Sequence, residues 1–518
     1  MYGWWNTNSA GALLKVVLFY SILLPVIESV VIFAYNAVYN VFRSPLAAYP
    51  GPLLWAMSPI PHELSKLRGR NHTDTLALHN RYGPVVRIAP NELSFNTAQA
   101  FKDVFNTNAF SKDPALYSPT PNGTRHLNSA RDDDDHKRMR RTIAPAFTDE
   151  AVRAHEGVVA SLSDTFINEL KKRALSGRTL NVDMKMWFNA ATFDIGAQLI
   201  FGESFCSMQN GRLHPWIKLI FDYIRAQSSL ETLARIIGPD WIQYLRSKLS
   251  KIQRQKMRWH FDHVSAKVET RLAQGTELKD WMTPALKTGI LKDAPGVKVS
   301  SGMTRDELDA NAHFMIIAAS ETTATTLSGI LYFLCTSPDV LKRLTAEIRD
   351  SFLNDSDITF ASTRDMKFLN ACISEGLRLY PPVPMGVPRL APLGGARVDG
   401  YFVPEGTVVR VCLYACARHA SNFASPDKFD PGRWLDMPNG TPAMGSDNFD
   451  ASQPFFRGPR KCLGEKFAWA QMRMILVKLL WGFDIELKQE SRRWMEEQLC
   501  FYLWHKGPLW VRLRERSD

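Results

Sequence analysis

The sequence predicts a mainly α-helical protein with a minor β component, built as a single large domain behind an N-terminal membrane helix. Hydrophobic residues make up 45% of the 518-residue chain, which is enough for a sizeable core. Apolar residues recur with helical spacing through residues 136–380, whereas strand-like alternation is confined to short segments such as 85–95 and 408–414. The chain holds no internal repeat and no long linker, which favours one domain over several.

The segment 16–35, VVLFYSILLPVIESVVIFAY, has the length and apolar character of a helix that crosses a bilayer. A cleaved secretory signal is the main alternative, but its apolar region would be shorter and would end at small residues. Pro25 and Glu28 also leave a kinked or in-plane helix open. We therefore predict that residues 1–42 form a membrane anchor with its flank.

Residues 43–52, RSPLAAYPGP, follow the anchor and contain three prolines, so we predict a stiff, extended hinge. Basic residues are more frequent after the span than before it, where Lys15 stands alone. This bias predicts a single-pass membrane protein whose residues 43–518 lie on the cytosolic side.

Charge and cysteine content exclude some classes of function. With 63 Lys+Arg against 52 Asp+Glu the formal charge is +11, but the cations are scattered and form no nucleic-acid-binding tract. A redox partner with an acidic face, or an anionic membrane surface, would suit this charge. The seven cysteines are odd in number and sparse, which indicates a reducing compartment, and the absence of a CxxC pair argues against a zinc site.

One cysteine stands in an unusual context, the segment 454–470, PFFRGPRKCLGEKFAWA. A helical pattern begins directly after Cys462, and a helix N-terminus stabilises a thiolate. Three interpretations are open: a buried structural cysteine, a nucleophile for which no local base is evident, or a ligand of haem iron. A single thiolate suffices for haem, because the porphyrin supplies the four in-plane donors.

The neighbours of Cys462 suit the haem interpretation. Gly458 permits a tight turn before the sulfur, and Gly464 would let the helix approach a flat cofactor closely. Arg460 offers a guanidinium to a haem propionate, and Phe455 offers an apolar cover on the sulfur side.

The pattern F-x-x-G-x-R-x-C-x-G over residues 455–464 resembles the haem-binding signature of the cytochrome P450 family. Phe456 departs from it, since a small residue is usual at that position. The resemblance extends over residues 43–518. It implies the cytochrome P450 fold and a catalytic domain that holds haem b through Cys462 as the axial thiolate.

Two further patterns resemble the same family and occur in the right order. SEGLRLYPP contains Glu375 and Arg378, three residues apart and therefore on one helix face, and FDPGRWL contains Arg433. The resemblance implies that these three residues form a buried structural network that braces the loop presenting Cys462.

Basic residues elsewhere match positions that contact haem propionates in the family. DDDDHKRMRR places His136 and Arg140 four residues apart on one helix face, and the acidic run before them suits a helix N-terminus. GVPRLAP contains Arg389. The resemblance implies that all three residues contribute to haem binding.

The segment 312–334 is a long apolar helix with Glu321 and Thr322 in its middle. A second membrane span and a new helix capped by Ser320 are alternative interpretations. The run Ala-Ala-Ser-Glu-Thr resembles the oxygen-activation motif of the family, with Ala319 in place of glycine. The resemblance implies that the helix opens locally, that Thr322 hydrogen-bonds at the oxygen site, that Glu321 relays protons, and that the extra methyl tightens the oxygen pocket.

The resemblance implies a haem-thiolate monooxygenase that inserts one atom of O₂ into a lipophilic small molecule. No flavin or nicotinamide fingerprint is evident, so electrons would come from a separate, membrane-bound NADPH-dependent reductase. The main alternative is a reductase-independent haem-thiolate isomerase or peroxygenase. A non-catalytic haem carrier is a third hypothesis without specific support.

YPGPLLWA and DDDDHKRMRRTIAPAFTDEAVRAHE resemble fungal microsomal members, and more narrowly the subgroup with trichothecene-type sesquiterpene hydroxylases. This implies the endoplasmic reticulum, contact with membrane lipid, and a terpenoid or polyketide substrate of secondary metabolism. By analogy, five segments would form the substrate pocket: 108–127, 205–245, 312–322, 383–388 and 496–503. Its lining would be mostly apolar, with Phe205, Trp216, Phe314, Val383, Met385 and Phe501.

Overall fold

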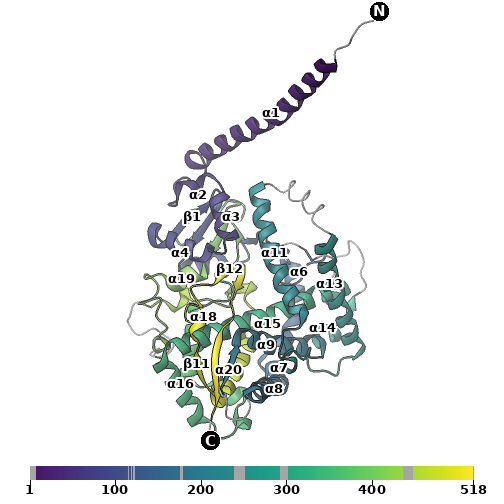
Figure 1. Ribbon diagram of the computed structural model, residues 1–518, viewed down its shortest axis with the longest axis vertical. Coiled ribbons are helices and arrows are strands. Elements are labelled where there is room, and N and C mark those ends of the chain that lie inside the picture. The colour runs from purple at the N-terminus through teal and green to yellow at the C-terminus, as the bar shows by residue number, and fades with distance from the viewer. Residues whose placement is uncertain are drawn as a thin grey trace, which may run out of the picture.

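The computed structural model describes residues 7–114, 116–117, 119–120, 123–174, 179–237, 251–291, 301–435 and 447–516. As the sequence predicts, the described chain is mainly helical with short strands (Figure 1). Its α-helices are α1 (Thr7–Phe42), α2 (Leu53–Met57), α3 (Ile60–Leu67), α4 (Asn71–Tyr82), α5 (Ala98–Phe105), α6 (Asp133–Ile143), α7 (Asp149–Ala154), α8 (Glu156–Ala174), α9 (Met184–Phe201), α10 (Ser207–Asn210), α11 (Pro215–Ile237), α13 (Lys251–Ala273), α14 (Thr283–Thr288), α15 (Arg305–Thr336), α16 (Pro338–Ser351), α17 (Phe360–Arg364), α18 (Lys367–Leu379), α19 (Leu413–Arg418) and α20 (Glu465–Gly482).

The strands form small sheets. The largest has the order β1 (Val85–Ala89), β2 (Glu92–Phe95), β10 (Val408–Val411), β7 (Arg389–Leu390), β3 (Ser111–Lys112). A three-stranded sheet has the order β11 (Phe483–Leu487), β14 (Trp510–Glu515), β4 (Leu180–Asp183). Three two-stranded pairs complete the set: β5 (Ile290–Leu291) with β6 (Met303–Thr304), β8 (Ala396–Val398) with β9 (Tyr401–Val403), and β12 (Leu499–Phe501) with β13 (Leu503–His505).

Helix α1 projects away from the rest of the protein (Figure 1). The most apolar 18-residue window of its segment Lys15–Phe42 has a mean hydropathy of 2.4, and none of that window is buried inside the protein. A helix of this length and exposure is consistent with membrane anchoring. Pro25 lies inside the helix without ending it, so the predicted span is part of one continuous helix.

The segment 43–52 is not a helix, as predicted, but the prediction of an extended hinge is wrong. It is a run of turns, with the amide of Ala47 donating to Ser44 (2.9 Å) and that of Tyr49 donating to Leu46 (3.1 Å). The buried guanidinium of Arg87 on β1 donates to the carbonyl of Asn40 at 2.8 Å and to the hydroxyl of Ser44 at 3.2 Å. These long-range bonds fold the segment against the sheet, which local proline content could not reveal.

Helix α15 runs through the middle of the molecule (Figure 1) and contacts α9, α18 and α20. It starts with a capping box, in which Thr304 accepts from the amide of Glu307 and the Glu307 side chain accepts from the amide of Thr304. In its most apolar window 67% of the residues are buried. It is therefore a core helix and not a second membrane span.

The helix is also continuous, so neither the local opening nor the new helix capped by Ser320 is present. The hydroxyl of Ser320 donates to the carbonyl of Ile316 at 2.6 Å, which supports the helix at this point. Ala319 lies against Gly196 of α9, where an added Cβ would come within 3.3 Å of the Ala319 methyl. The methyl that replaces glycine thus fits because the facing residue has no side chain.

Candidate functional site

The loop before α20 is closed by its own backbone and by a neighbouring helix. The amide of Cys462 donates to the carbonyl of Phe455 at 2.9 Å. Gly458 has a φ of +72°, and a Cβ there would lie 1.9 Å from the carbonyl oxygen of Phe105 at the end of α5. Gly464 is the N-cap of α20, and a Cβ on it would meet no protein atom closer than 3.9 Å. The loop is therefore fixed on the Gly458 side and open on the Gly464 side.

Phe456, the departure from the family pattern, also has a positive φ, of 58°. Its ring packs edge-on against Phe101 and Phe105 of α5, with centroids 6.4 and 5.3 Å apart. The large side chain thus joins a hydrophobic cluster around α5, which accounts for its size.

Cys462 differs from most cysteines of the chain. Its side chain is exposed, as is that of Cys206, whereas Cys372, Cys412 and Cys500 are buried. The surrounding protein raises the pKa of the Cys462 thiol, mainly by desolvation, while the amide of Gly464 and nearby cations lower it. Desolvation is also the largest cause at Cys500, whose thiol pKa is raised to about 12. Cys462 is therefore an accessible thiol at a helix N-terminus with donors around it.

Five basic side chains meet near this loop: His136, Arg140, Arg389, Arg460 and Lys112. Burial, followed by the charges of the other four, lowers the pKa of His136 to about 3. The structure thus brings together the three predicted contacts His136, Arg140 and Arg389 with Arg460 of the cysteine loop.

Most hydrogen-bond acceptors of these cations are carbonyl or hydroxyl oxygens, and few are carboxylates. Arg460 donates to Asp133 at 2.6 Å and to the carbonyl of Ala130 at 2.7 Å. Arg140 donates to the carbonyl of Lys461 at 3.0 Å, next to Cys462. Arg389 is buried and donates to the hydroxyl of Tyr117 at 3.1 Å.

Sequence analysis missed Lys112. Strand β3 pairs with β7, which sets Lys112 opposite Arg389. Its Nζ donates to the carbonyl of Asn128 at 2.6 Å and lies 5.0 Å from the ring centroid of Tyr117. Burial, followed by the charges of Arg460 and Arg389, lowers the pKa of Lys112 to about 6. A strand of two residues leaves no periodic pattern, so no signal in the sequence pointed to this lysine.

A cavity beside this group is lined by four basic residues, Lys112, Arg131, Arg389 and Arg460, and by one carboxylate, Asp133. Buried positive charge is unfavourable unless an anion compensates it. An anionic group placed here would relieve that imbalance, and a flat group could approach α20 at Gly464. Together with the accessible thiol of Cys462, these features fit haem b, which carries two propionates and accepts a thiolate ligand.

Glu375, Arg378 and Arg433 form one network, in which the carboxylate and Arg378 are fully buried. Arg378 donates through Nε and Nη2 to the two oxygens of Glu375, each at 2.8 Å. Arg433 donates to Oε1 of Glu375 at 3.0 Å. Sequence analysis missed two further members: Trp434, which donates to Oε2 of Glu375 at 2.9 Å, and Asp447, which pairs with Arg433. Every oxygen of this buried carboxylate is thus hydrogen-bonded.

One face of α15 is only half-buried although the helix crosses the core. Between residues 312 and 322 the half-buried positions are Phe314, Met315, Ile317, Ala318, Ala319 and Thr322, and most of them recur one turn apart. The hydroxyl of Thr322 donates to the carbonyl of Ala318 at 2.8 Å. Thr322 therefore lies on the accessible face, with its proton bonded to the helix backbone.

Glu321 is buried beside Thr322 and forms an ion pair with Lys506, which sequence analysis also missed. Thr325 joins the pair, donating to Oε1 of Glu321 at 3.2 Å and accepting from Lys506 at 2.5 Å. Oε2 of Glu321 finds no hydrogen-bond partner in the part of the chain that the structure describes.

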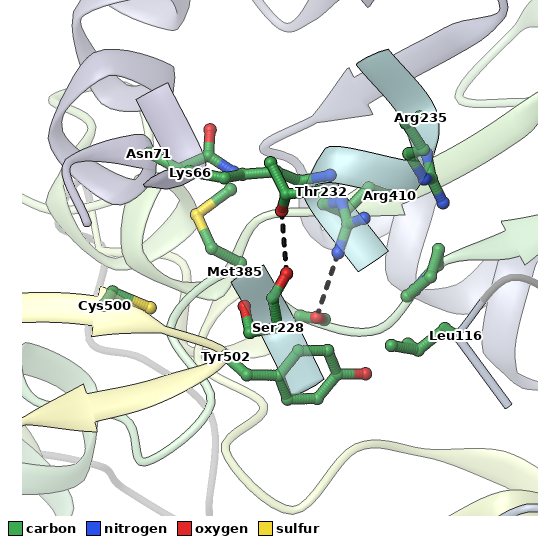
Figure 2. A pocket seen from close by; sticks show the side chains of 12 residues that line it. Lys66, Asn71, Leu116, Ser228, Thr232, Arg235, Met385, Arg410, Cys500 and Tyr502 are labelled. Atoms are coloured by element: carbon green, nitrogen blue, oxygen red, sulfur yellow. Dashed lines mark hydrogen bonds between the residues drawn. The ribbon is translucent and has the colours of Figure 1, made fainter. Parts of the chain in front are cut away.

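A separate pocket is shown in Figure 2. Four of the five segments predicted to form a substrate pocket contribute to it, through the described residues Leu116, Ser228, Thr232, Arg235, Met385, Gly386, Pro388, Cys500 and Tyr502. Lys66, Arg235 and Arg410 also line this pocket, and no residue of 312–322 does, so the apolar substrate pocket stays a prediction. Of the six apolar residues named from the sequence, Met385 alone belongs to its lining.

Trp216, one of the six residues named from the sequence, lies in the core. Its side chain is fully buried and its Nε1 donates to His260, while its ring packs edge-on against Phe193 and Phe205. Apolar residues in this part of the chain thus fill the core between helices. Composition alone could not separate core from pocket.

Comparisons with known proteins agree with this geometry. A family model described as cytochrome P450 matches residues 48–510. The chain is 38% identical over 498 residues to cytochrome P450 monooxygenase aclL of Aspergillus oryzae, covering 95% of this chain and 98% of the relative. It is 38% identical over 485 residues to averantin hydroxylase of Dothistroma septosporum, covering 92% and 88%. It is 39% identical over 487 residues to cytochrome P450 monooxygenase stcF of Emericella nidulans, covering 93% and 97%.

A solved structure supports the fold. The crystal structure of the cytochrome P450DA haem domain matches with a TM-score of 0.72 at 17% identity, over 90% of this chain and 98% of that one. The family match covers most of the chain, and the fungal relatives cover nearly all of it at identities near 38%. The chain therefore belongs to the cytochrome P450 family of haem-thiolate monooxygenases.

Proposed function

We propose that Cys462 would hold haem b through its thiolate and that the protein inserts one oxygen atom from O₂ into a lipophilic secondary metabolite. The observation that carries this proposal is the accessible thiol at the N-terminus of α20, close to basic side chains that include those of a cavity with four cations and one carboxylate. When bound, the haem supplies the oxygen activation that no side chain can provide.

The surrounding residues bind and orient the group. Arg140, Arg389, Arg460 and Lys112 would receive the propionates, with His136 donating as a neutral imidazole. Binding of two carboxylates among these cations would relieve their mutual repulsion. The same repulsion explains why the site would select a dianionic cofactor.

Other residues support the sulfur. The carbonyl of Phe455 accepts a hydrogen bond from the amide of Cys462, and the half-buried ring of Phe455 packs against the main core. Gly464 leaves space beside α20. The network around Glu375 holds Arg433, which reaches Asp447 ahead of the cysteine loop, and so braces the approach to Cys462.

On α15, Thr322 and Glu321 would move protons to the reacting oxygen. The Thr322 hydroxyl can rotate away from the Ala318 carbonyl to donate toward the accessible face of the helix. Glu321 offers Oε2, which has no partner among the described residues, as the atom that receives and releases a proton.

Electrons would come from a membrane-bound NADPH-dependent reductase, because members of this family generally need a redox partner. The exposed, apolar α1 supports a place in the endoplasmic reticulum membrane with the catalytic domain in the cytosol. The names of two relatives, both averantin hydroxylases, support hydroxylation as the reaction. A terpenoid or polyketide remains our prediction for the substrate class, and the narrower resemblance to sesquiterpene hydroxylases stays a prediction.

The test is turnover of candidate metabolites by the purified protein with reductase and NADPH under ¹⁸O₂. We expect one ¹⁸O atom per product and no product without reductase. Product formed without reductase, either as an isomer of the substrate or with peroxide as the oxygen donor, would favour the isomerase or peroxygenase alternative.

A further inference from the structure

We infer that Lys506 is a positioning residue for Glu321: it holds this glutamate ionised, engages Oε1, and leaves Oε2 open for proton exchange. The inference rests on the proposed function, because proton delivery matters only if the protein activates O₂. It names a residue that the sequence motif around Glu321 and Thr322 does not contain.

The pair is a contact between distant parts of the chain. Lys506 follows β13, 185 positions after Glu321 in α15. Both side chains are only 3% exposed, so neither charge can rely on water. A buried charge without a partner is strongly unfavourable, which means that each ion depends on the other.

The backbone around Lys506 is fixed on both sides. The indole of Trp504 donates to the carbonyl of Pro381 at 2.8 Å, and the indole of Trp494 donates to the carbonyl of Gly507 at 3.0 Å. Because these bonds flank the lysine, its ammonium group has little freedom to leave the carboxylate. The pair therefore has one well-defined geometry.

In this geometry one carboxylate oxygen of Glu321 is hydrogen-bonded and the other is not. Lys506 and Thr325 both contact Oε1 of Glu321, whereas Oε2 has no partner in the described part of the chain. Glu375 is the natural comparison within the same protein. Both of its oxygens are fully engaged, as a structural carboxylate requires.

The pair lies among further ionisable groups. Burial lowers the pKa of Lys506, but Glu321 opposes this shift by attraction and by its hydrogen bond. Lys185 adds a second positive charge nearby, and the negative charge of Glu321 contributes to a raised pKa at Tyr380. Without Lys506, burial would favour the neutral carboxylic acid.

The consequence is a proton acceptor that is ionised before each turnover. Oε2 can take a proton from solvent through water and release it toward the Thr322 face, with no net change at Glu321. A glutamate that already held its proton would deliver one and then depend on reloading through the same buried route. Lys506 thus sets the state from which Glu321 starts.

Lys506→Met in the full-length holoenzyme tests this inference without relying on activity. We expect a new protonated-carboxyl band in infrared spectra of ¹³C-glutamate-labelled protein, and its loss in Lys506→Met/Glu321→Gln. Lys506→Arg keeps the positive charge and should show no band. Lys478→Met is a matched control, because Lys478 is equally buried but pairs with half-exposed Asp164 and Asp355.

Kinetics give the second readout. We expect the kcat of Lys506→Met to fall by about tenfold or more, as loss of acid–base function does, with Lys478→Met unchanged apart from stability. If Lys506→Met does not fold, the double variant must fold, because it removes both charges. No carboxyl band in Lys506→Met, a band that persists in the double variant, or a double variant that stays unfolded would overturn the inference. If the wild type fails to oxygenate any substrate, the proposed function fails, and the infrared result still decides the state of Glu321.

Discussion

Gly458 lies so close to the carbonyl of Phe105 that a methyl group added to the glycine would overlap the oxygen. The added Cβ would be 1.9 Å from that oxygen. The φ of +72° at Gly458 is one that other residues rarely adopt. The loop that presents Cys462 is therefore pressed against the end of α5. This contact links the sulfur to the hydrophobic cluster in which Phe105 and Phe456 pack.

We expect Gly458→Ala to lower stability by about 3 kcal/mol or more and to reduce haem loading. A left-handed backbone costs about 1–2 kcal/mol and overpacking about 1–3 kcal/mol. Thermal unfolding and the ratio of haem to protein absorbance measure both effects. Gly464→Ala is the control, because its Cβ would stay 3.9 Å from Phe147, so only haem loading should fall. A Gly458→Ala protein with full haem content would contradict this account.

We expect Cys462→Ser to abolish the absorption band that reduced, carbon monoxide-treated protein shows with a thiolate ligand. The reason is that serine keeps the size but not the soft, easily ionised sulfur. Cys206→Ser, which changes the other exposed cysteine, should keep the band. A thiolate-type spectrum in Cys462→Ser would show that another residue ligates the iron.

Much of the fold was predictable because local patterns specify helices. The helix after Cys462, the long helix with Glu321 and the apolar N-terminal helix all follow from spacing that the structure reproduces. Glu375 and Arg378 were identifiable because they lie three residues apart on one helix.

The remaining features depend on contacts between distant segments. Lys112 comes opposite Arg389 through a two-residue strand, and Lys506 reaches Glu321 from the far end of the chain. The bent segment 43–52 is shaped by a guanidinium on β1. None of these pairings leaves a periodic or compositional trace, so reading along the sequence could not find them.

We expect Lys112→Met to stabilise the haem-free protein while weakening haem binding. The folded protein lowers the pKa of Lys112 from 10.5 to about 6, so between these values the unfolded chain binds more protons. Wild-type stability should therefore rise with pH across this window, and the variant should lose that slope. Each kcal/mol gained should raise Tm by about 1 °C in a chain of this length. Thermal unfolding between pH 6 and 9 measures the effect.

The control for this experiment is Lys102→Met, whose partly exposed lysine pairs with Asp450 at 2.8 Å. A surface pair contributes about 0–1 kcal/mol, so stability and haem affinity should change little. If Lys112→Met binds haem as tightly as the wild type, Lys112 does not contact the cofactor.

We expect Thr322→Ala to keep haem binding but to lower the product formed per NADPH. Loss of the bond to Ala318 should reduce stability by about 1 kcal/mol. NADPH consumption should continue while hydrogen peroxide or water replaces oxygenated product. Thr326→Ala is matched, since its hydroxyl makes the same bond to the Thr322 carbonyl at 3.0 Å, and it should leave coupling unchanged. Equal coupling in both variants would assign Thr322 a purely structural role.

The hydrogen bonds of Arg87 indicate where the N-terminal anchor can be removed without loss of stability. Its buried Nη1 donates to the carbonyl of Asn40, and the side chain of Asn40 donates to the carbonyl of Met57 at 3.1 Å. Deletion of residues 1–36 keeps these bonds, so we expect a folded, haem-loaded domain as stable as the full chain. Deletion of residues 1–42 removes this acceptor of the Arg87 guanidinium. The free energy of unfolding should therefore fall by about 1–3 kcal/mol.

Thermal unfolding of the two truncated proteins, each with its haem content measured, provides the comparison. Arg87→Met in both backgrounds is the decisive control, because a residue that cannot donate should reduce the stability difference between the two deletions. Any difference that survives Arg87→Met would come from the other contacts of residues 37–42, namely the bond from Asn40 to the carbonyl of Met57 and the packing of buried Ala37. Failure of both deletions to bind haem would instead show that α1 is part of the catalytic domain and not a separable anchor.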